Sequence, residues 1–435
     1  LEMCIRDSLN IIKNMRAILH SDLNNFYASV ECLLNPELDG FPVVVCGRKE
    51  DRHGIVLAKN MLAKKMGVKT GMVLFEAEKL CPNLKCVPAR HDMYLKYSRA
   101  VRRIYLEYTD MVEPFGIDEA WLDVTSSPKC GGDAYKIADE IRRRVKEEIG
   151  LTVSIGVSFN KVFAKLGSDI KKPDAITVIN KENYKSMVWK LPASDLLYVG
   201  RATKEKLQKL NIKTIGELAV CSKAILVSKL GKWGEVLKSY ACGQDQDPVR
   251  KYEERDEIKS VGNSLTYYRD IKTDDDVYAL LTLLAESVCS RMKHDGFKLA
   301  RTVCLTITNN NLESKIRMKK LDHASGLSSE IAGAAYELFK KNFSWGEGLV
   351  RGLGISVCDF TNSEQLDFCG KQSKRDKLVK LEETIENVRD RFGRNIINKG
   401  IVFTDEHMKE LDIRGEIGAL SKEKMNARPL PTVGY

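Results

Sequence analysis

Short apolar runs separated by polar turns predict the first elements of the chain. Residues 17–22, Ala-Ile-Leu-His-Ser-Asp, have the pattern of a buried strand that ends in a carboxylate, and residues 25–31 begin a helix. Two further strands, divided by a polar turn, and a lysine-bearing helix are predicted at 42–46, 54–58 and 60–66.

The middle of the chain mixes helical and strand patterns without a strict βαβ repeat. Apolar positions recur at helical spacing over 89–108, and residues 112–124 predict a strand, a bend marked by Pro and Gly, and a second strand. A helix, a strand and another helix are predicted at 134–149, 152–158 and 161–169. This mixture favours an α+β core.

The second half of the chain predicts a helical region followed by a second small domain. Residues 184–240 are helical throughout, with Gly200 and Gly216 as interruptions, and the polar residues 245–256 have the composition of a linker. The second domain is predicted to be α/β, with helices and strands at 274–293, 303–308, 326–341 and 350–360. The composition then becomes polar, with one helix expected at 374–392.

Composition excludes several classes of protein. The 435 residues are 43% hydrophobic and 30% charged, which is typical of a globular protein with a full core. No apolar run approaches the roughly 20 residues of a membrane helix, so a membrane-spanning protein is excluded. Twelve cysteines without a CxxC pair predict reduced thiols in a cytoplasmic protein, with a structural zinc site as the alternative. Residues 1–14 lack strand alternation or a core stripe, and we expect a non-native leader there.

The net charge of +10 is concentrated in two regions. Residues 47–90 contain ten Lys/Arg against four Asp/Glu, and residues 161–250 contain seventeen against nine. Two separate basic regions on an otherwise balanced chain predict a polyanion contacted at two places. Solvated helix faces would give the same distribution, so the charge alone leaves both interpretations open.

Three acidic residues are the strongest candidates for chemistry: Asp22 at a strand end, and Asp118 and Glu119 at a strand bend. Carboxylates clustered in a core repel one another unless a cation neutralises them, and such hard oxygen ligands suit Mg²⁺. Taken alone, each carboxylate also fits a surface or capping residue. Because adjacent strand residues point to opposite faces, Asp118 and Glu119 can share a site only if the bend redirects one of them.

Three sequence blocks around these carboxylates resemble one family. Residues 21–31, SDLNNFYASVE, resemble the opening motif of the Y-family DNA polymerases, the low-fidelity enzymes that copy damaged DNA. Residues 116–123, GIDEAWLD, are similar to the family motif SIDEA(F/Y)LD. Residues 156–165, GVSFNKVFAK, and the KKP at 171–173 resemble its GxSxNKxxAK…KP block. The blocks follow the family's order and spacing.

The resemblance implies a metal site. Asp22 and Asp118 would bind both of two Mg²⁺ ions, and Glu119 would bind the ion at the primer 3′-hydroxyl. The Leu23 carbonyl would complete the ion on the triphosphate side. The implied reaction is phosphoryl transfer, in which one ion lowers the pKa of the hydroxyl and the other stabilises the leaving pyrophosphate. Exonuclease proofreading would require a second acidic constellation, which the sequence does not offer.

The resemblance also implies a nucleotide pocket at the start of the first helix. The amides of Asn24, Asn25 and Phe26 would approach the triphosphate, where the helix dipole favours anions. Tyr27 occupies the family's steric-gate position, at which an aromatic ring blocks a ribose 2′-hydroxyl. The alternative for Tyr27 is an aromatic residue of the core.

Lysines would supply positive charge near the phosphates. Lys165 and Lys172 fall in the third family block. Many family members grip the triphosphate with Tyr-x-x-Arg in the fingers, whereas residues 61–64 of this chain are MLAK. Lys64 is a point charge without the bidentate fork of Arg. This pattern resembles the UmuC branch of the family more than the DinB branch.

DNA contacts are implied in two further regions. Residues 197–207 resemble the helix-hairpin-helix of the family's thumb, which offers backbone N–H groups to phosphates, with Gly200 and Lys204 as expected contacts. Tyr198 replaces the family's first hairpin glycine. In the little finger, the family's additional DNA-gripping domain, the expected contacts are Arg291, Arg301 and Arg317.

A short motif follows that domain. Residues 365–369, QLDFC, resemble the QLxLF motif that binds a sliding clamp, through Gln365, Leu366 and Phe368. A chance match in a polar tail is the alternative.

The resemblance implies a right-hand polymerase of α+β multidomain fold. It would have a ferredoxin-like palm, small fingers, a helical thumb and an α/β little finger. The expected boundaries are 15–25 and 91–179 for the palm, 26–90 for the fingers, 180–246 for the thumb, 247–256 for a linker, 257–361 for the little finger and 362–435 for a tail.

The predicted function is low-fidelity, template-directed DNA synthesis across damage, in DNA repair and the SOS response. Primed template DNA and deoxynucleoside triphosphates would be the substrates. A sliding clamp, a UmuD-type subunit and a recombinase filament are candidate partners, and no membrane partner is expected. One alternative is a catalytically silent DNA-binding accessory protein of the same fold. A second is a two-metal nuclease or nucleotide cyclase on a palm-like core.

Overall fold

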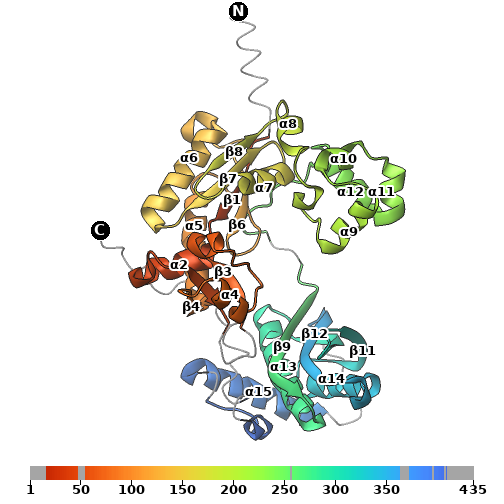
Figure 1. The fold of residues 1–435 in the computed structure, drawn as a ribbon. Helices are drawn as coiled ribbons and strands as arrows, with labels where there is room; N and C mark the ends of the chain where they lie inside the picture. The colour runs from red at the N-terminus through yellow and green to blue at the C-terminus, as the bar shows by residue number, and fades with distance from the viewer. Residues whose placement is uncertain are drawn as a thin grey trace, which may run out of the picture. The chain divides into compact units, whose positions relative to one another are not determined.

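The structure is a computed structural model that describes residues 16–47, 54–254, 257–362, 372–393, 396–405 and 408 (Figure 1). It divides into two compact units. Among the described residues, the first unit comprises 16–46 and 55–254, and the second comprises 257–408 together with Gly47 and Gly54. None of the described helices combines the length and the apolarity that a membrane crossing requires.

A five-stranded sheet in the order β5-β6-β1-β7-β8 forms the centre of the first unit. β1 is antiparallel to both of its neighbours, and β8 runs parallel to β7. The strands expected at 17–22, 112–124 and 152–158 are confirmed, whereas β8 is additional. The strands are β1 (Ile18–Leu23), β5 (Val112–Pro114), β6 (Glu119–Asp123), β7 (Val153–Ser158) and β8 (Ile176–Ile179).

Helices cover this sheet and continue into a helical region of the same unit (Figure 1). The helix expected at 134–149 is α6 followed by a π-helical turn over 145–149. The helices are α2 (Phe26–Leu34), α3 (Met61–Lys65), α4 (Leu74–Leu80), α5 (His91–Leu106), α6 (Ala134–Arg144), α7 (Lys161–Ile170), α8 (Tyr184–Val188), α9 (Arg201–Lys209), α10 (Ile215–Val220), α11 (Lys223–Leu230) and α12 (Lys232–Ala241).

The alternation of side chains along β1 gives the sheet two different faces. On one face the buried Ser21 hydrogen-bonds to Tyr105 of α5 at 2.8 Å. On the other face His20 hydrogen-bonds to Ser168 of α7 at 2.8 Å. Asp22 is two residues beyond His20 and therefore lies on the α7 face as well.

A close approach between α7 and β7 fixes the position of that helix. A Cβ atom at Gly156 of β7 would lie 1.9 Å from the carbonyl oxygen of Ala164 and 2.6 Å from the backbone nitrogen of Ser168. Only glycine allows the two backbones to come so near. The functional residues of α7 are thus held directly against the centre of the sheet.

A second, three-stranded sheet has the order β3-β2-β4. Its strands are β2 (Val43–Cys46), β3 (Val56–Lys59) and β4 (Lys85–Pro88), of which β4 was not expected from the sequence. Apolar residues of β2, α3 and α4 form a small core of their own, which includes Val44, Ala63 and Leu74. Asn60 caps α3 through its side chain, so the helix expected at 60–66 is confirmed.

The helical region α8–α12 shares a hydrophobic core with α7, including Phe163, Leu207 and Leu218. Gly200 precedes α9 as its N-cap, as the sequence predicts. The expected interruption at Gly216 is wrong, because this residue lies inside α10. A Cβ there would lie 3.0 Å from the Cβ of Trp189, so this glycine serves close packing and does not break the helix.

The segment that follows α12 is held against the first unit as far as Tyr252. Val249 is fully buried with residues of β1, β6 and α7. The carboxylate of Glu113 on β5 pairs with Lys161 at 2.7 Å and with Arg250 at 3.2 Å. The Tyr252 N–H donates to the carbonyl of Asp110 at 3.2 Å. Most of the segment expected to be a polar linker is therefore anchored.

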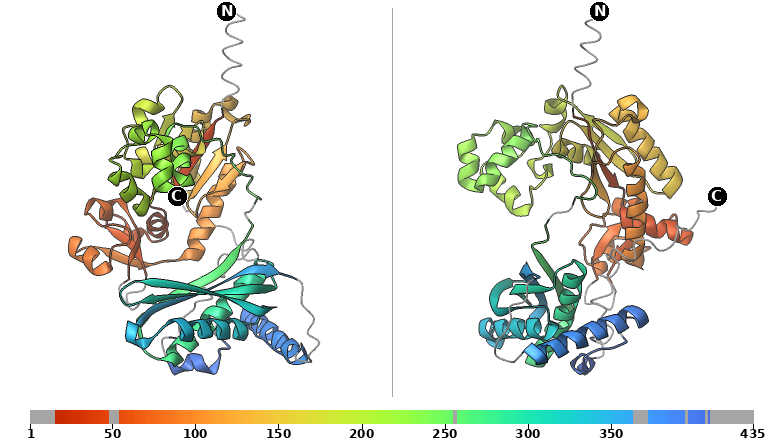
Figure 2. Two further views of the ribbon diagram at one scale, coloured as in Figure 1. Left: turned by 90° about the vertical axis from the view of Figure 1, so that its right-hand side faces the viewer. Right: turned by 180° about the vertical axis from the view of Figure 1, so that it is seen from behind.

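The second unit contains an antiparallel sheet in the order β11-β10-β12-β9. Its helices lie on one face of the sheet (Figure 2, left). The strands are β9 (Ser260–Ile271), β10 (Leu299–Asn309), β11 (Ser314–Ser325) and β12 (Val350–Thr361), and the helices are α13 (Asp274–His294), α14 (Ser328–Asn342) and α15 (Gln372–Phe392).

The two faces of this sheet differ sharply in side-chain size. Val303, Leu305 and Ile307 of β10 are buried in the core beneath the helices. The alternate residues of β10 face the other way, and their partners on β12 are small, such as Gly354 opposite Thr306, whereas their partners on β11 include the exposed Ile316 and Met318. The helix expected at 374–392 is confirmed as α15.

Candidate active site

The three predicted carboxylates meet at one end of the five-stranded sheet. Asp22 on β1 is directly opposite Glu119, the first residue of β6, so both lie on the face that α7 covers. Asp118 precedes β6 in a bend, where its carbonyl accepts a hydrogen bond from the Leu23 N–H at 3.0 Å. Gly116 in this bend has φ +90°, a conformation that favours glycine. The bend removes Asp118 from strand alternation, which allows the two adjacent carboxylates to share a site.

Two lysines of the third family block pair with the carboxylates of Asp22 and Glu119. Lys165 Nζ lies 2.7 Å from Glu119 Oε2 and 3.9 Å from Asp22 Oδ2. Lys172 Nζ lies 2.8 Å from Asp22 Oδ2. Both lysines also contact Asp169, at 3.5 and 2.8 Å. Asp169 was not predicted from the sequence as a member of this site, although it is one helical turn after Lys165.

The electrostatics of the site differ from one carboxylate to the next. Burial, together with the charge of Glu119, raises the pKa of Asp22 to about 6 despite its contact with Lys172. Burial and the same charge also raise the pKa of Asp118. Burial opposes ionisation of Glu119 too, but contacts with His20 and Lys165 hold the pKa of Glu119 well below its usual range. Two of the three carboxylates thus lack full compensation for their charge.

The donor chemistry of this site fits a divalent cation. Its groups are carboxylate oxygens on the C-terminal part of β1 and at the start of β6, and a cation would relieve the cost that raises the pKa of Asp22. Within the described residues, no three His, Cys, Asp or Glu side chains are already gathered as a metal cage. The lysine ammonium groups are the carboxylates' cationic partners in this arrangement.

A buried histidine lies beside Glu119. His20 is fully buried, with Nε2 at 3.2 Å from Glu119 Oε2 and Nδ1 at 2.8 Å from Ser168 Oγ. Its ring is in edge-on contact with Trp121, the centroids being 5.2 Å apart. Burial lowers the pKa of His20 to about 4, so the ring is neutral at pH 7. The sequence analysis placed His20 in a strand without giving it a role.

The start of α2 differs in part from the expected phosphate cradle. The N–H of Asn24 donates to the carbonyl of Thr152 at 2.9 Å, and its side chain hydrogen-bonds to Thr152 and Ser154. The expectation that this amide approaches a phosphate is therefore corrected. Asn25 is the N-cap of α2 in the left-handed conformation, and the N–H of Phe26 belongs to the first helical turn. The Phe26 ring itself is buried in the core.

Tyr27 is half-buried and is supported from behind by another tyrosine. Its ring stacks on that of Tyr94, with centroids 4.1 Å apart and an angle of 11° between the planes. Tyr94 donates a hydrogen bond to the buried Glu31 at 2.7 Å, and Glu31 also pairs with Arg90. This network was not predicted from the sequence, because its members lie on α2 and at the start of α5, far apart in the chain.

The residues expected to contact DNA in the first unit lie at its surface. Lys64 on α3 and Lys204 on α9 are exposed, and Gly200 is the exposed N-cap of α9. Tyr198 has φ +67°, in the left-handed region that favours glycine, the residue that the family motif has at this position. The Tyr198 ring packs against Trp233, with centroids 5.7 Å apart.

Two of the expected contacts in the second unit are engaged within that unit. Arg291 donates to the carbonyl of Gly262, and Arg317 donates to Asn342 Oδ1 at 3.1 Å. Arg301 is exposed at a bulge of β10. The clamp motif through Gln365, Leu366 and Phe368 lies outside the described residues, as does the leader expected at 1–14.

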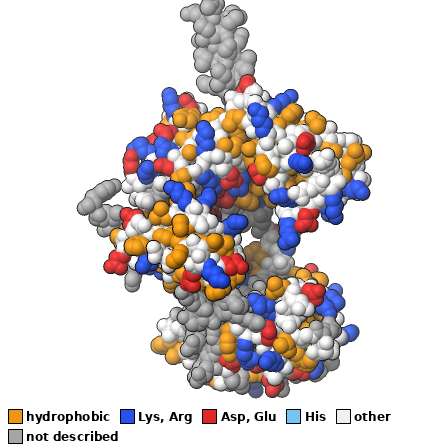
Figure 3. Space-filling model, in the orientation of Figure 1, with side chains coloured by type: hydrophobic (Ala, Val, Ile, Leu, Met, Phe, Trp, Pro, Cys, Tyr) orange, Lys and Arg blue, Asp and Glu red, His pale blue; other side chains and the backbone are white. Residues whose placement is uncertain are grey.

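Surface charge does not single out one site. On the face shown in Figure 3, Lys and Arg side chains are spread among acidic and hydrophobic ones. The basic regions of the sequence therefore do not form a single positive patch on this face.

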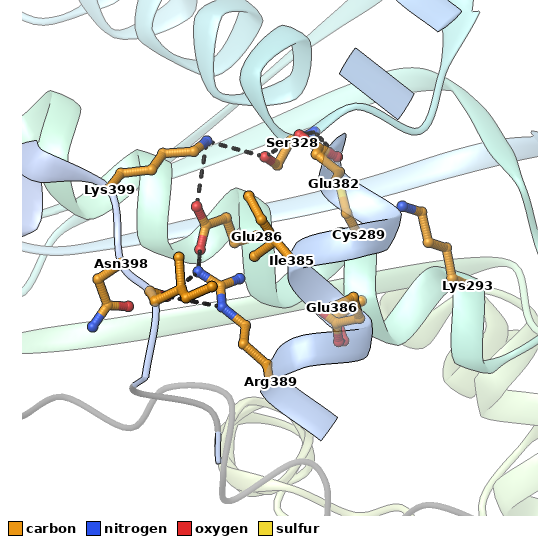
Figure 4. A pocket seen from close by; sticks show the side chains of 12 residues that line it. Glu286, Cys289, Lys293, Ser328, Glu382, Ile385, Glu386, Arg389, Asn398 and Lys399 are labelled. Atoms are coloured by element: carbon orange, nitrogen blue, oxygen red, sulfur yellow. Dashed lines mark hydrogen bonds and ion pairs between the residues drawn. The ribbon is translucent and has the colours of Figure 1, made fainter. Parts of the chain in front are cut away.

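A separate pocket of about 100 Å³ lies between α13 and α15 in the second unit (Figure 4). Its wall contains the buried pair of Arg389 and Glu286, with Nη2 and Oε2 3.2 Å apart, and Lys399 contacts Glu286 at 3.3 Å. Ser328 donates to Glu382 at 2.6 Å. These groups satisfy one another, so we interpret the pocket as part of the packing of α15.

Solved structures share this fold. A Y-family DNA polymerase chimera, Dbh-Dpo4(243-245)-Dbh, aligns with a TM-score of 0.69 and 24% identity over 80% of this chain and 100% of the chimera. An insertion ternary complex of Dbh DNA polymerase aligns with a TM-score of 0.55, also over 80% of this chain and 100% of that chain. The fold is thus that of a right-hand polymerase, as the sequence predicts.

Sequence comparison identifies the family. The profile of the impB/mucB/samB family matches residues 21–169, and the profile of its C-terminal domain matches 258–368. A DNA polymerase IV of Acetivibrio thermocellus is 50% identical over 91% of this chain and 100% of its own length. A DNA polymerase IV of Moorella thermoacetica is 35% identical over 89% of this chain and 96% of its own length. The chain belongs to the impB/mucB/samB family, the Y-family of translesion DNA-directed DNA polymerases. Its assignment to the UmuC branch stays a prediction.

Proposed function

We propose that this chain inserts deoxynucleotides opposite damaged template positions by nucleotidyl transfer assisted by two Mg²⁺ ions. The observation that carries this proposal is the pairing of Asp22 and Glu119 with Lys165 and Lys172 at one end of the sheet, with Asp118 near enough for the charge of Glu119 to act on it. The relatives named above are called DNA polymerase IV, and they match this chain over nearly its whole length.

The carboxylates would hold the cations. Asp22 and Asp118 would bind both ions, Glu119 the ion at the primer terminus, and the Leu23 carbonyl the ion on the triphosphate side. When bound, the ions supply a lowered pKa of the attacking hydroxyl and stabilise the leaving pyrophosphate. The raised pKa of Asp22 supports this assignment because burial and the neighbouring charge of Glu119 outweigh the contacts with Lys172 and Lys165, and a cation would offset that cost.

The lysines and α2 would bind the triphosphate. Lys165 and Lys172 now pair with carboxylates, and we propose that they turn to the phosphates when cations take over those carboxylates. The N–H groups of Asn25 and Phe26 at the start of α2 would add donors in a region where the helix dipole favours anions. Lys64 would contribute a more distant charge. Tyr27, supported by Tyr94, would exclude a ribose 2′-hydroxyl.

The two units would correspond to the domains of a right hand. The five-stranded sheet is proposed as the palm (15–25 and 91–179), the three-stranded sheet as the fingers (26–90) and α8–α12 as the thumb (180–246). The second unit would contain the little finger (257–361). The thumb would offer Gly200 and Lys204 to the DNA backbone, and Arg301 would contribute from the little finger. Because these contacts are ionic, DNA affinity should fall steeply with salt.

We further propose a role in DNA repair and the SOS response in the cytoplasm. The clamp motif at 365–368 would attach the enzyme to a sliding clamp. A UmuD-type subunit and a recombinase filament are the other proposed partners. The family resemblance and the clamp motif are the grounds on which we propose these partners.

The experiment is primer extension on an undamaged template and on one with an abasic site, with Mg²⁺ and dNTPs. We expect distributive extension of the primer on both templates, including insertion opposite the abasic site. Replacing Mg²⁺ with EDTA should abolish extension on both. If the protein binds primed DNA in a salt-sensitive manner yet extends neither primer, with or without a clamp and a UmuD-type subunit, the proposal is wrong and an accessory role takes its place.

A further inference from the structure

His20 and Ser168 form a buried pair whose geometry bears on Glu119. His20 lies on β1 and Ser168 on α7, and their side chains are joined at 2.8 Å between Nδ1 and Oγ. Both residues are fully buried. On the other side of the ring, His20 Nε2 faces Glu119 Oε2 at 3.2 Å. Nε2 is also a buried polar atom without a well-aligned hydrogen bond among the described residues.

The position of the proton on His20 depends on Ser168. A serine hydroxyl has one hydrogen to donate, and Ser168 Oγ lies within reach of two acceptors, His20 Nδ1 at 2.8 Å and the Lys165 carbonyl at 2.7 Å. If the hydroxyl donates to the carbonyl, Nδ1 must carry the ring proton. A neutral ring would then present the bare lone pair of Nε2 to a carboxylate at 3.2 Å, which is repulsive.

The opposite arrangement satisfies every group. The Lys165 carbonyl lies inside α7, where it already accepts the helical hydrogen bond from the N–H four residues further along the chain. If Ser168 donates to Nδ1, the ring proton is at Nε2 and points toward Glu119. Trp121 holds the ring edge-on, so the imidazole has little freedom to turn away.

We propose that His20 and Ser168 are positioning residues for Glu119. Ser168 fixes the tautomer of His20 that carries its proton at Nε2, and this N–H orients the Glu119 carboxylate. The ring holds one oxygen of Glu119 and leaves the other for the cation at the primer terminus. The inference rests on the proposed role of Glu119. It adds two residues that would touch neither substrate nor cation.

His20 faces only one oxygen of Glu119, Oε2, which Lys165 also contacts at 2.7 Å. Partners of this kind, one contact removed from a metal, typically change metal affinity or activity by about 10- to 100-fold when they are removed.

The test compares His20→Phe, His20→Gln and Ser168→Ala with the wild type. Ser158→Ala is the matched control, because Ser158 is another buried serine that donates a hydrogen bond, to the Ile179 carbonyl at 2.8 Å. Binding of Mn²⁺ to the complex with primed DNA is measured by electron paramagnetic resonance. Single-turnover insertion gives the maximal rate and the dNTP affinity separately. Primed-DNA affinity and thermal melting report on folding.

We expect His20→Phe and Ser168→Ala to weaken Mn²⁺ binding or slow the maximal rate by about 10-fold or more, with unchanged DNA and dNTP affinity. His20→Gln, whose amide can donate in place of Nε2–H, should recover most of the loss. In ¹⁵N spectra of histidine-labelled protein, Ser168→Ala should shift His20 away from the tautomer protonated at Nε2.

Wild-type Mn²⁺ affinity and rate in a folded Ser168→Ala and in His20→Phe would overturn the inference. If His20→Phe does not fold, the Mn²⁺ affinity, rate and His20 tautomer of Ser168→Ala decide whether the inference holds. A wild-type protein that fails to insert nucleotides contradicts the proposed function, whereas variants that match an active wild type contradict only the inference.

Discussion

We propose that the ring of Tyr27 distinguishes deoxyribonucleotides from ribonucleotides at this site. Its stacking on Tyr94 prevents it from retreating when a 2′-hydroxyl approaches. We predict that Tyr27→Ala raises insertion of ribonucleotides relative to deoxynucleotides by roughly 100-fold, because a single hydroxyl is then no longer excluded. Competing insertion of a ribonucleotide and its deoxy counterpart measures this ratio.

Tyr27→Phe is the matched control, since it keeps the ring and removes only the hydroxyl. It should discriminate between the sugars as the wild type does. If Tyr27→Ala also discriminates as the wild type does, Tyr27 is a core aromatic and not a steric gate.

At the scale of single residues, much of the site can be predicted from sequence. Asp22, Asp118 and Glu119 lie in motifs whose residue types are dictated by their chemistry, and the structure brings them together. The hydrogen bonds of Asn24 could not be predicted in this way, because its partners, Thr152 just before β7 and Ser154 within it, are about 130 residues away in the chain. His20 was missed because a buried histidine in a strand has no local signal for its partners.

At the scale of elements, the position of α7 depends on Gly156. Because a Cβ there would lie 1.9 Å from the Ala164 carbonyl, Gly156→Ala must push α7 away from the sheet. We predict a loss of about 3 kcal/mol in the free energy of unfolding and a loss of activity, since Lys165 and Ser168 move with the helix. Urea unfolding and primer extension measure both effects.

Gly333→Ala is the control for this prediction. Gly333 lies within α14, and a Cβ there would have open space around it. The same substitution should stabilise the chain by about 0.5–1 kcal/mol, because alanine is the better helix former. Equal effects of the two substitutions would show that the close approach at Gly156 does not constrain the fold.

Glu113 predicts a pH-dependent contribution to stability. Burial would raise the pKa of Glu113, but Lys161 and Arg250 outweigh burial and lower it. A lowered pKa in the folded state means that Glu113 stabilises the protein above its ordinary pKa of 4.5, and that this stabilisation is lost as the pH falls. Glu113→Gln should therefore lower stability at pH 7 by about 3 kcal/mol, with a smaller difference at pH 4.

Melting temperatures of wild type and Glu113→Gln at the two pH values test this. A difference that is as large at pH 4 as at pH 7 would mean that the charge of Glu113 is not what anchors the segment after α12.

Strands with a clear apolar face were the elements that sequence predicted best. β1, β2 and β7 are buried along their length, and each contains apolar residues that mark it, from the continuous run of β2 to the Ile18–Leu19 start of β1. β11 is an edge strand with charged residues on both faces, and β9 is rich in small polar residues, so neither shows the alternation that marks a half-buried strand. Gly216 was misjudged because close packing against Trp189, and not a turn, requires it.

At the scale of the whole molecule, α15 extends the second unit beyond the domain that the family profile matches. Its attachment depends on Arg389, which is 6% exposed and pairs with Glu286. We predict that Arg389→Met weakens this attachment by about 3 kcal/mol, because Glu286 loses one buried partner. Hydrogen exchange of the α15 amides should then accelerate by roughly 100-fold, which corresponds to that energy.

Arg375→Met is the comparison. Arg375 is also on α15, but it is 26% exposed and pairs with Glu330 nearer to solvent. Its removal should weaken α15 by about 1 kcal/mol or less. If exchange in α15 is unchanged by Arg389→Met, the buried pair does not hold this helix in place.

We propose that the carboxylates at the end of β1 and the start of β6 form the catalytic metal site of a DNA polymerase. Single-turnover nucleotide insertion with Mg²⁺ by wild type, Asp118→Asn and Asp123→Asn tests this directly. Asp118 precedes β6 and Asp123 ends it, and the Asp123 carboxylate accepts hydrogen bonds from the N–H and the hydroxyl of the nearby Thr125. We predict that Asp118→Asn slows insertion by about 1,000-fold while Asp123→Asn leaves it near the wild-type rate. An Asp118→Asn variant that inserts nucleotides as fast as Asp123→Asn would contradict the claim.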